Sequence, residues 1–194
     1  MVADPLTPTR SGSGPTDAAL VVAARAGEGW AQEALYRRYA RMAFGLSHRI
    51  LAGREDVDDL VQDAFVYALN RLDTLENPQA FASWLGSIVT RTAGKRLRHH
   101  RLLVRLGIRH AEPIDPATLV SKTVSPEVAA ELRTVYTLLD SLPASERVAL
   151  VLRRVEGMEL TEIASSMGLS LATVKRRLAA AERRLLARKG ASYV

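Results

Sequence analysis

The chain has 194 residues, of which 47% are hydrophobic and only 5% aromatic, and it contains no cysteine. The lack of cysteine excludes disulfides and thiolate metal sites, and no apolar run approaches the roughly 18–20 residues of a membrane span. The N-terminus also lacks the apolar core of a secretory signal. Long stretches rich in Ala, Leu, Arg and Glu predict an all-α fold. We therefore expect a soluble, cytoplasmic, helical protein.

The net charge of +6 is unevenly distributed along the chain. Residues 91–110 carry seven cations and no acid, and residues 142–190 carry ten cations and five acids. Residues 111–141, which lie between these two blocks, are acidic. Two basic blocks joined by an acidic connector indicate contact with a polyanion at two places.

The first part of the chain predicts a tail and two helices. Pro, Gly, Ser and Thr dominate residues 1–16, which we expect to be disordered. A short helix is expected over residues 17–27, with Thr16 as its N-cap. Apolar residues at helical spacing then predict a longer helix over residues 30–51, which Gly53 ends.

Five acidic residues mark the third expected helix, residues 55–72. Acids near a helix N-terminus are stabilised by the helix dipole, which explains the first three of them. It does not explain Gln62 and Asp63, which lie two turns further on. Together with Asp59, these residues either are simply solvated or bind a basic partner helix, and the pattern alone favours neither interpretation.

A fourth helix is expected after a loop over residues 73–77, with Pro78 in its first turn. Its beginning is apolar, with Phe81 and Trp84, and it becomes strongly basic from Arg91 onward. Aromatic residues beside a cationic helix are able to stack on unpaired bases. Packing in the core of a small bundle is the simpler role, and we favour it for Trp84.

Two small helical domains are expected, over residues 17–106 and 126–190. Residues 107–125 between them contain two prolines and little periodicity, which predicts a flexible linker. The second domain begins with helices expected over residues 126–141 and 144–156.

The strongest local pattern lies in residues 160–188. A helix ends at Gly168, which is free to take a positive φ, and Ser170 is a good N-cap for the next helix. The expected buried stripe of that second helix comprises Leu171, Val174, Leu178, Ala181 and Leu185. Small and cationic residues lie opposite and beside the stripe, as in a helix-turn-helix that enters a DNA groove. A solvated amphipathic helix is the simpler alternative, but the glycine turn favours DNA binding.

Several motifs together resemble a known family. DLVQDAF, the Phe81-Trp84-Leu85 helix start, the LP-x-x-x-R opening and TVKRRL resemble regions 2 and 4 of bacterial extracytoplasmic-function (ECF) RNA polymerase sigma factors. The resemblance covers residues 17–105 and 126–189, and no single motif would suffice for it.

This resemblance implies a role for each basic and acidic surface. The first domain would bind the β′ coiled coil of core RNA polymerase through Asp59, Leu60, Gln62 and Asp63. It would read the single-stranded −10 element through Leu75, Asn77, Gln79, Arg91, Lys95, Arg96 and Arg98. The second domain would read the duplex −35 element through Thr173, Lys175, Arg176, Arg177, Ala179, Ala180 and Arg183. The resemblance also implies contact with the polymerase β subunit and an anti-sigma partner that binds between the two domains.

Three residues depart from the family pattern. Arg91 stands where an Asn is usual, Lys95 where an Asp or Asn is common, and Arg176 where a small residue is usual. The first two add charge where a −10 base would be contacted. Arg176 adds a cation that could bind guanine with two hydrogen bonds or grip a phosphate.

Two other function classes account for less of the sequence. A standalone helix-turn-helix regulator with an N-terminal interaction domain would explain the C-terminal basic block but not the acidic and basic helices before it. For an enzyme, the sequence offers no glycine-rich phosphate loop, no nucleophile–base pair and no cluster of metal ligands. His99 and His100 are adjacent and point apart on a helix, so no metal or other cofactor is expected.

Overall fold

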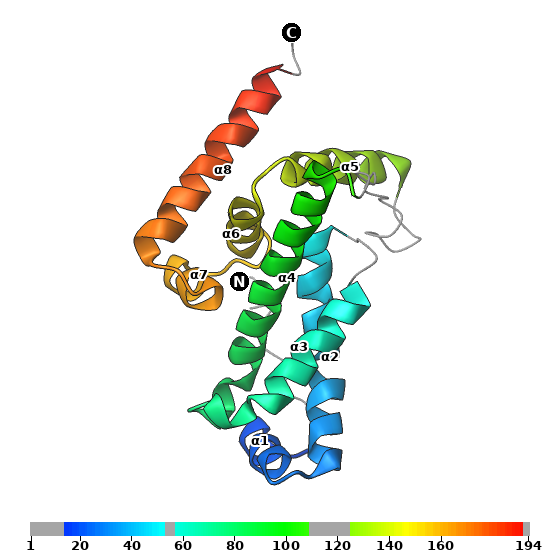
Figure 1. Cartoon of the computed structure of the whole chain (residues 1–194), viewed down its shortest axis with the longest axis vertical. Helices are drawn as coiled ribbons and strands as arrows, with labels where there is room; N and C mark the ends of the chain where they lie inside the picture. Colours follow the sequence, from blue (N-terminus) through cyan, green and yellow to red (C-terminus); the bar gives the residue numbers. More distant parts are fainter. Residues whose placement is uncertain (1–13, 53–56, 109–124, 192–194) are drawn as a thin grey trace.

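The computed structural model describes residues 14–52, 57–108 and 125–191, and all regular structure in these ranges is helical (Figure 1). The all-α prediction is therefore confirmed. Residues 1–13 of the predicted tail, 109–124 of the predicted linker, and Gly53 lie outside the described residues. The elements in chain order are α1 Asp17–Arg25, α2 Gly29–Leu51, α3 Val57–Asn70, η1 Leu72–Thr74, η2 Pro78–Ala80, α4 Phe81–Arg105, α5 Pro126–Asp140, α6 Ala144–Arg154, α7 Leu160–Met167 and α8 Leu171–Ala191.

Helices α2, α3 and α4 pack side by side and form the body of the N-terminal unit, and α1 crosses one end (Figure 1). Leu35, Leu60 and Leu85, one from each of the three helices, are fully buried in the shared core. The α1 start agrees with the prediction, because the Thr16 hydroxyl accepts a hydrogen bond of 3.2 Å from the Ala19 backbone N–H.

Two local features differ from the prediction. Helix α2 ends at Leu51 as predicted, but Ala52 takes the left-handed conformation, with φ 60°, that we expected a glycine to adopt. The 3₁₀ turn η1 takes up the start of the predicted loop over residues 73–77, and a second 3₁₀ turn, η2, stands where Pro78 was expected in the first turn of the fourth helix. Here Asn77 caps η2, since its side-chain oxygen accepts from the Gln79 backbone N–H at 3.0 Å.

The C-terminal unit is built of α5 to α8, with α6 and α7 both packed on α8. Gly168 has φ 64° and ends α7, which confirms the predicted helix-turn-helix turn. Ser170 caps α8 by accepting from the Thr173 backbone N–H at 3.2 Å. Val174 and Ala181 of the predicted stripe are fully buried, but Leu171 is 39% exposed, so the prediction was wrong for that residue. Leu171 is the first residue of α8.

The two units pack directly on each other. Helix α7 lies against α4, and α6 contacts both α4 and α2 (Figure 1). Helix α8 lies on the far side of α6 and α7 from α4. None of the described helices is both long enough and apolar enough to cross a bilayer.

Candidate nucleic-acid interface

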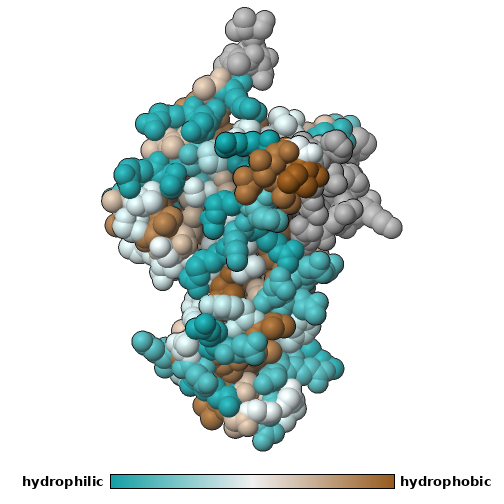
Figure 2. All heavy atoms as spheres, viewed as in Figure 1, coloured by the Kyte–Doolittle hydropathy of each residue, from teal (hydrophilic) through white to brown (hydrophobic). Residues whose placement is uncertain are grey.

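Helix α8 presents the face that the sequence predicts for duplex DNA. Lys175, Arg176, Arg177 and Arg183 are exposed, while Val174 on the opposite side is fully buried. Ala179 is exposed, and Thr173 and Ala180 are half-buried at the edge of this face. Figure 2 shows hydrophilic side chains interspersed with less hydrophilic ones along α8. A row of cations beside small residues suits a helix that approaches a groove closely.

The side chain of Arg176 is held at the start of α8. Its guanidinium donates to the Thr173 hydroxyl at 3.2 Å, and that hydroxyl lies 2.9 Å from the Ser170 hydroxyl that caps the helix. These hydrogen bonds hold the Arg176 guanidinium beside the N-terminal cap of α8. A guanidinium in this place is able to bind a phosphate or the edge of a guanine.

Of the predicted −10 residues between η1 and α4, two are at the surface and one is not. Asn77 and Gln79 are exposed, whereas Leu75 is 4% exposed and belongs to the hydrophobic core. The prediction that the Leu75 side chain contacts DNA directly is therefore corrected. Arg25 of α1 fixes this loop, because its guanidinium donates to the carbonyls of Leu72 and Leu75. No local pattern points to Arg25, because it lies 47 residues before Leu72.

The predicted −10 cations of α4 lie on two faces. Arg91, Lys95 and Arg98 are exposed and share one face at helical spacing. The Arg91 guanidinium lies 3.4 Å from the Ser166 carbonyl oxygen near the end of α7, to which it donates. Arg96 lies on the face toward α3, where it forms an ion pair of 2.5 Å with Asp63.

The acidic face of α3 is exposed as predicted for Asp59, Gln62 and Asp63. Leu60 is fully buried, so in this structure its side chain belongs to the core beneath this face and is not accessible to a partner, contrary to the predicted contact. Two apolar side chains that were not predicted for this surface, Val66 and Tyr67, are 54% and 52% exposed. The sequence signal that could have found them is the position of Val66 and Tyr67 one helical turn after Asp63, which places them on the same face.

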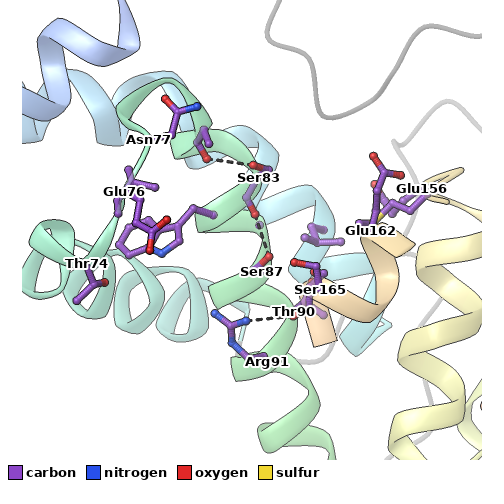
Figure 3. A pocket seen from close by; sticks show the side chains of 17 residues that line it. Thr74, Glu76, Asn77, Ser83, Ser87, Thr90, Arg91, Glu156, Glu162 and Ser165 are labelled. Carbon is purple, nitrogen blue, oxygen red and sulfur yellow. Dashed lines mark hydrogen bonds between the residues drawn. The ribbon is translucent and has the colours of Figure 1, made fainter. Parts of the chain in front are cut away.

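A cavity of about 600 Å³, lined by both polar and apolar residues, lies where α7 faces α4 (Figure 3). Ser83, Ser87 and Arg91 come from α4, and Glu162 and Ser165 come from α7. Trp84, predicted as a core residue, packs on the core and also lines this cavity.

One further acid at the cavity, Glu156, was not predicted. Its side chain is 1% exposed, and both of its carboxylate oxygens accept from the Arg49 guanidinium of α2. No group of three or more His, Cys, Asp or Glu side chains that could hold a metal ion occurs among the residues that the structure describes.

Comparison with known proteins identifies both units. A family model described as Sigma-70 region 2 matches residues 35–102, and one described as Sigma-70, region 4 matches residues 132–185. The ECF RNA polymerase sigma-E factor of Haemophilus influenzae is 30% identical over 174 residues, which cover 84% of this chain and 89% of that relative. The ECF RNA polymerase sigma factor SigM of Mycobacterium tuberculosis is 30% identical over 170 residues, which cover 88% of this chain and 83% of that relative.

Two solved structures share the fold. CnrH in complex with the cytosolic domain of CnrY matches with a TM-score of 0.59 and 29% identity, over 90% of this chain and 97% of that one. The sigma factor RpoE in complex with the anti-sigma factor NepR from Bartonella quintana matches with a TM-score of 0.59 and 20% identity, over 79% of this chain and 92% of that one.

Proposed function

We propose how this chain, which belongs to the ECF RNA polymerase sigma factors and so directs RNA polymerase to promoters, divides its task between two units. Residues 17–106 bind core polymerase and the −10 element, and residues 126–190 bind the −35 element. The observation that carries this division is the placement of the exposed cations on α4 and α8, which belong to different units. The chain is a non-enzymatic specificity subunit, and the standalone regulator does not account for the region 2 match.

The −35 contact is assigned to the exposed face of α8. Support comes from four exposed cations, Lys175, Arg176, Arg177 and Arg183, that flank the small Ala179 and Ala180. Phosphate contacts position such a helix, and contacts with base edges provide the specificity. Thr173 and Arg176 lie in the first two turns of α8 and are hydrogen-bonded to each other beside the Ser170 cap, at the end of the helix where recognition helices meet base edges.

The −10 contact is assigned to Asn77 and Gln79 of the loop and to Arg91, Lys95 and Arg98 of α4. All five residues are exposed at the surface that begins with the Asn77 cap. Amide side chains are suited to hydrogen bonds with the edges of unpaired bases, and the cations are suited to the phosphates of a single strand. Arg96, paired with Asp63, contributes charge to the rim of this surface.

Polymerase docking is assigned to the α3 face of Asp59, Gln62, Asp63, Val66 and Tyr67. An exposed acidic face with an apolar border suits a basic helical partner, as the β′ coiled coil of core polymerase is expected to be. The C-terminal unit then meets the β subunit. Binding through two units at once raises the effective concentration of each DNA-reading surface at the promoter.

An anti-sigma partner is proposed as well. Support comes from CnrH, whose solved structure contains the cytosolic domain of CnrY and covers most of this chain. All of these contacts take place in the cytoplasm, where the polymerase acts.

Transcription in vitro tests the proposed function. Purified core polymerase is incubated with a pool of genomic fragments, with and without this chain, and the transcript starts are mapped. We expect discrete starts only when the chain is present, with two shared sequence elements upstream. Core polymerase that binds the chain yet gives no new starts would contradict the proposal.

A further inference from the structure

Helix α6 packs across α8 and forms an ion pair with each of its two flanks (Figure 1). In the first turn of α6, Oε2 of Glu146 lies 3.1 Å from Nε of Arg184. In its last turn, the Arg154 guanidinium donates to the Glu182 carboxylate at 2.8 Å. Glu146 and Arg154 are about 12 Å apart along α6, which is about the width of a helix, so the two pairs hold α8 from both sides of its buried stripe.

The Glu146 carboxylate differs from those of ordinary surface ion pairs because it is buried. Its side chain is 4% exposed, whereas that of Arg184 is 60% exposed, and Oε2 of Glu146 accepts no hydrogen bond from the residues that the structure describes. The helix dipole favours an acid in the first turn of α6, but it would favour an exposed acid equally. A buried charge is costly unless an opposite charge compensates it. Arg184 supplies that compensation, and the pair in turn holds the Arg184 guanidinium against α6.

Arg184 lies on a flank of α8 that also carries residues assigned to DNA. It follows Ala180 by one helical turn and Arg177 by two, so the three residues share one face of the helix. Arg183, the residue before it, is exposed and belongs to the proposed −35 surface. Without Glu146, the Arg184 guanidinium would be a further cation within reach of the backbone of a bound duplex.

We propose that Glu146 is a specificity-determining residue for promoter recognition, an inference that rests on the proposed function of α8. By pairing with Arg184, it keeps that cation from DNA phosphates and fixes the orientation in which Thr173 and Arg176 meet base edges. A cation on a phosphate adds affinity for every duplex, whereas base contacts depend on how the helix is oriented. Neutralising Glu146 therefore strengthens binding to DNA of any sequence and reduces the preference for the −35 element.

The salt dependence of non-specific DNA binding tests whether Arg184 is restrained. Fluorescence anisotropy is measured for the full chain and a labelled duplex of random sequence at several salt concentrations. We expect Glu146→Gln to bind at least about threefold more tightly, with a slope of log affinity against log salt that is steeper by about one. Adding Arg184→Gln to Glu146→Gln should restore both values, because it removes the released cation. A purely structural role of Glu146 predicts weaker binding, so unchanged or weaker binding by the folded Glu146→Gln chain would overturn the proposal.

The two adjacent arginines of α8 give a second comparison that leaves Glu146 intact. Arg183→Gln is expected to weaken binding to the random duplex at least about threefold, whereas Arg184→Gln should change it by less than about twofold, because Arg184 is already held by α6. Equal losses in the two variants would overturn the restraint. Circular dichroism checks folding, and if Glu146→Gln does not fold, the comparison of the arginines decides.

Glu131→Gln is the matched control for net charge. It removes an exposed acid of α5 and should leave both the affinity and the salt slope unchanged. A gain in affinity equal to that of Glu146→Gln would attribute the effect to general electrostatics and overturn the proposal.

The ratio of the affinities for a promoter duplex and for its scrambled sequence tests the effect on specificity. The promoter duplex is taken from upstream of a transcript start that depends on this chain. We expect the ratio to fall at least about threefold in Glu146→Gln, and an unchanged ratio would overturn the role in specificity. Transcription separates this inference from the proposed function. Missing starts with the unsubstituted chain contradict the proposed function, whereas promoter-dependent starts with an unchanged ratio overturn the role of Glu146 alone.

Discussion

The hydroxyl group of Tyr39 is one of the polar links between α1 and α2. Tyr39 is 1% exposed, and its hydroxyl donates to the Asp17 carboxylate, which also accepts from Arg38 at 2.5 Å. Burial, followed by the hydrogen bond with Asp17, raises the pKa of Tyr39 well above its ordinary value. The phenol therefore stays protonated in the folded chain at pH values where it would ionise in the unfolded chain.

Tyr39→Phe tests this contact. We expect the free energy of unfolding to fall by about 0.5–1.5 kcal/mol at neutral pH, because the hydrogen bond is lost. Since the pKa is raised in the folded state, the difference between the two chains is fully present below the unfolded-state pKa of about 10 and shrinks as the pH rises above it. Urea unfolding at pH 7 and near pH 11 measures both values, and an equal difference at the two pH values would contradict the pairing.

Arg176 is the second residue-scale case, because its added cation lies at the start of the recognition helix. We expect Arg176→Ala to weaken binding of the polymerase complex to a −35 duplex by about 1–3 kcal/mol while polymerase affinity is unchanged. Filter binding or anisotropy measures the loss. The control is Arg37→Ala, which removes an arginine on α2 that is 77% exposed and paired with Glu33 of the same helix. An equal effect of both substitutions would indicate general electrostatics and contradict the assignment.

The α7–α8 turn is an element whose geometry depends on one backbone conformation. Gly168 has φ 64°, and its N–H and that of Leu169 donate to carbonyls of α7. We expect Gly168→Ala to destabilise the chain by about 1–2 kcal/mol, because a Cβ disfavours the left-handed region. Gly29→Ala is the matched control at an open helical site and should instead stabilise by about 0.4–1 kcal/mol. Thermal unfolding measures both variants, and we expect their melting temperatures to shift in opposite directions from that of the unsubstituted chain.

The acidic face of α3 is the element that we assign to polymerase. Asp63 is 64% exposed despite its ion pair with Arg96, so it remains accessible to a partner. We expect Asp63→Arg to lower the affinity for core polymerase at least about tenfold, or 1.4 kcal/mol, because it places like charges together. Arg96→Ala breaks the same ion pair without changing α3 and should keep polymerase affinity in the absence of DNA. A similar loss in both variants would attribute the effect to the ion pair and not to docking.

At the scale of the whole molecule, the two units form one body through α4. Leu97 and Val148 are buried with residues of both units in a contiguous core, and Gly94 lies where α6 approaches α4. The C-terminal unit therefore covers part of α4 through α6 and α7, whereas the cations Arg91, Lys95 and Arg98 of α4 and the cations of α8 remain exposed.

Calorimetry tests whether the two units stabilise each other. We expect a single unfolding transition for the natural chain, because each unit covers apolar surface of the other. Gly94→Leu is expected to split it into two transitions, since a larger side chain separates α6 from α4, and Gly94→Ala should keep one. Two transitions in the natural chain would show that the units do not stabilise each other.

The local patterns of the sequence determined the helices, the Gly168 turn, the Ser170 cap and the exposed cations of α8. Each depends on residues only a few positions apart, and helical periodicity and capping act over that range. The same patterns did not separate core from surface at Leu60, Leu75 and Leu171. Burial of an apolar residue depends on which element covers it, and periodicity on one helix does not contain that information.

Only the tertiary structure decided which partners the charges have. Arg91, Arg96 and Asp63 are read from the sequence as ligands for other molecules, yet each already binds a residue of this chain. The pair of Arg49 and Glu156 joins residues 107 positions apart and has no local signature. Ion pairs form between opposite charges that the packing brings within a few ångströms of each other. The sequence therefore determines which residues are charged, and the tertiary structure determines which of them pair.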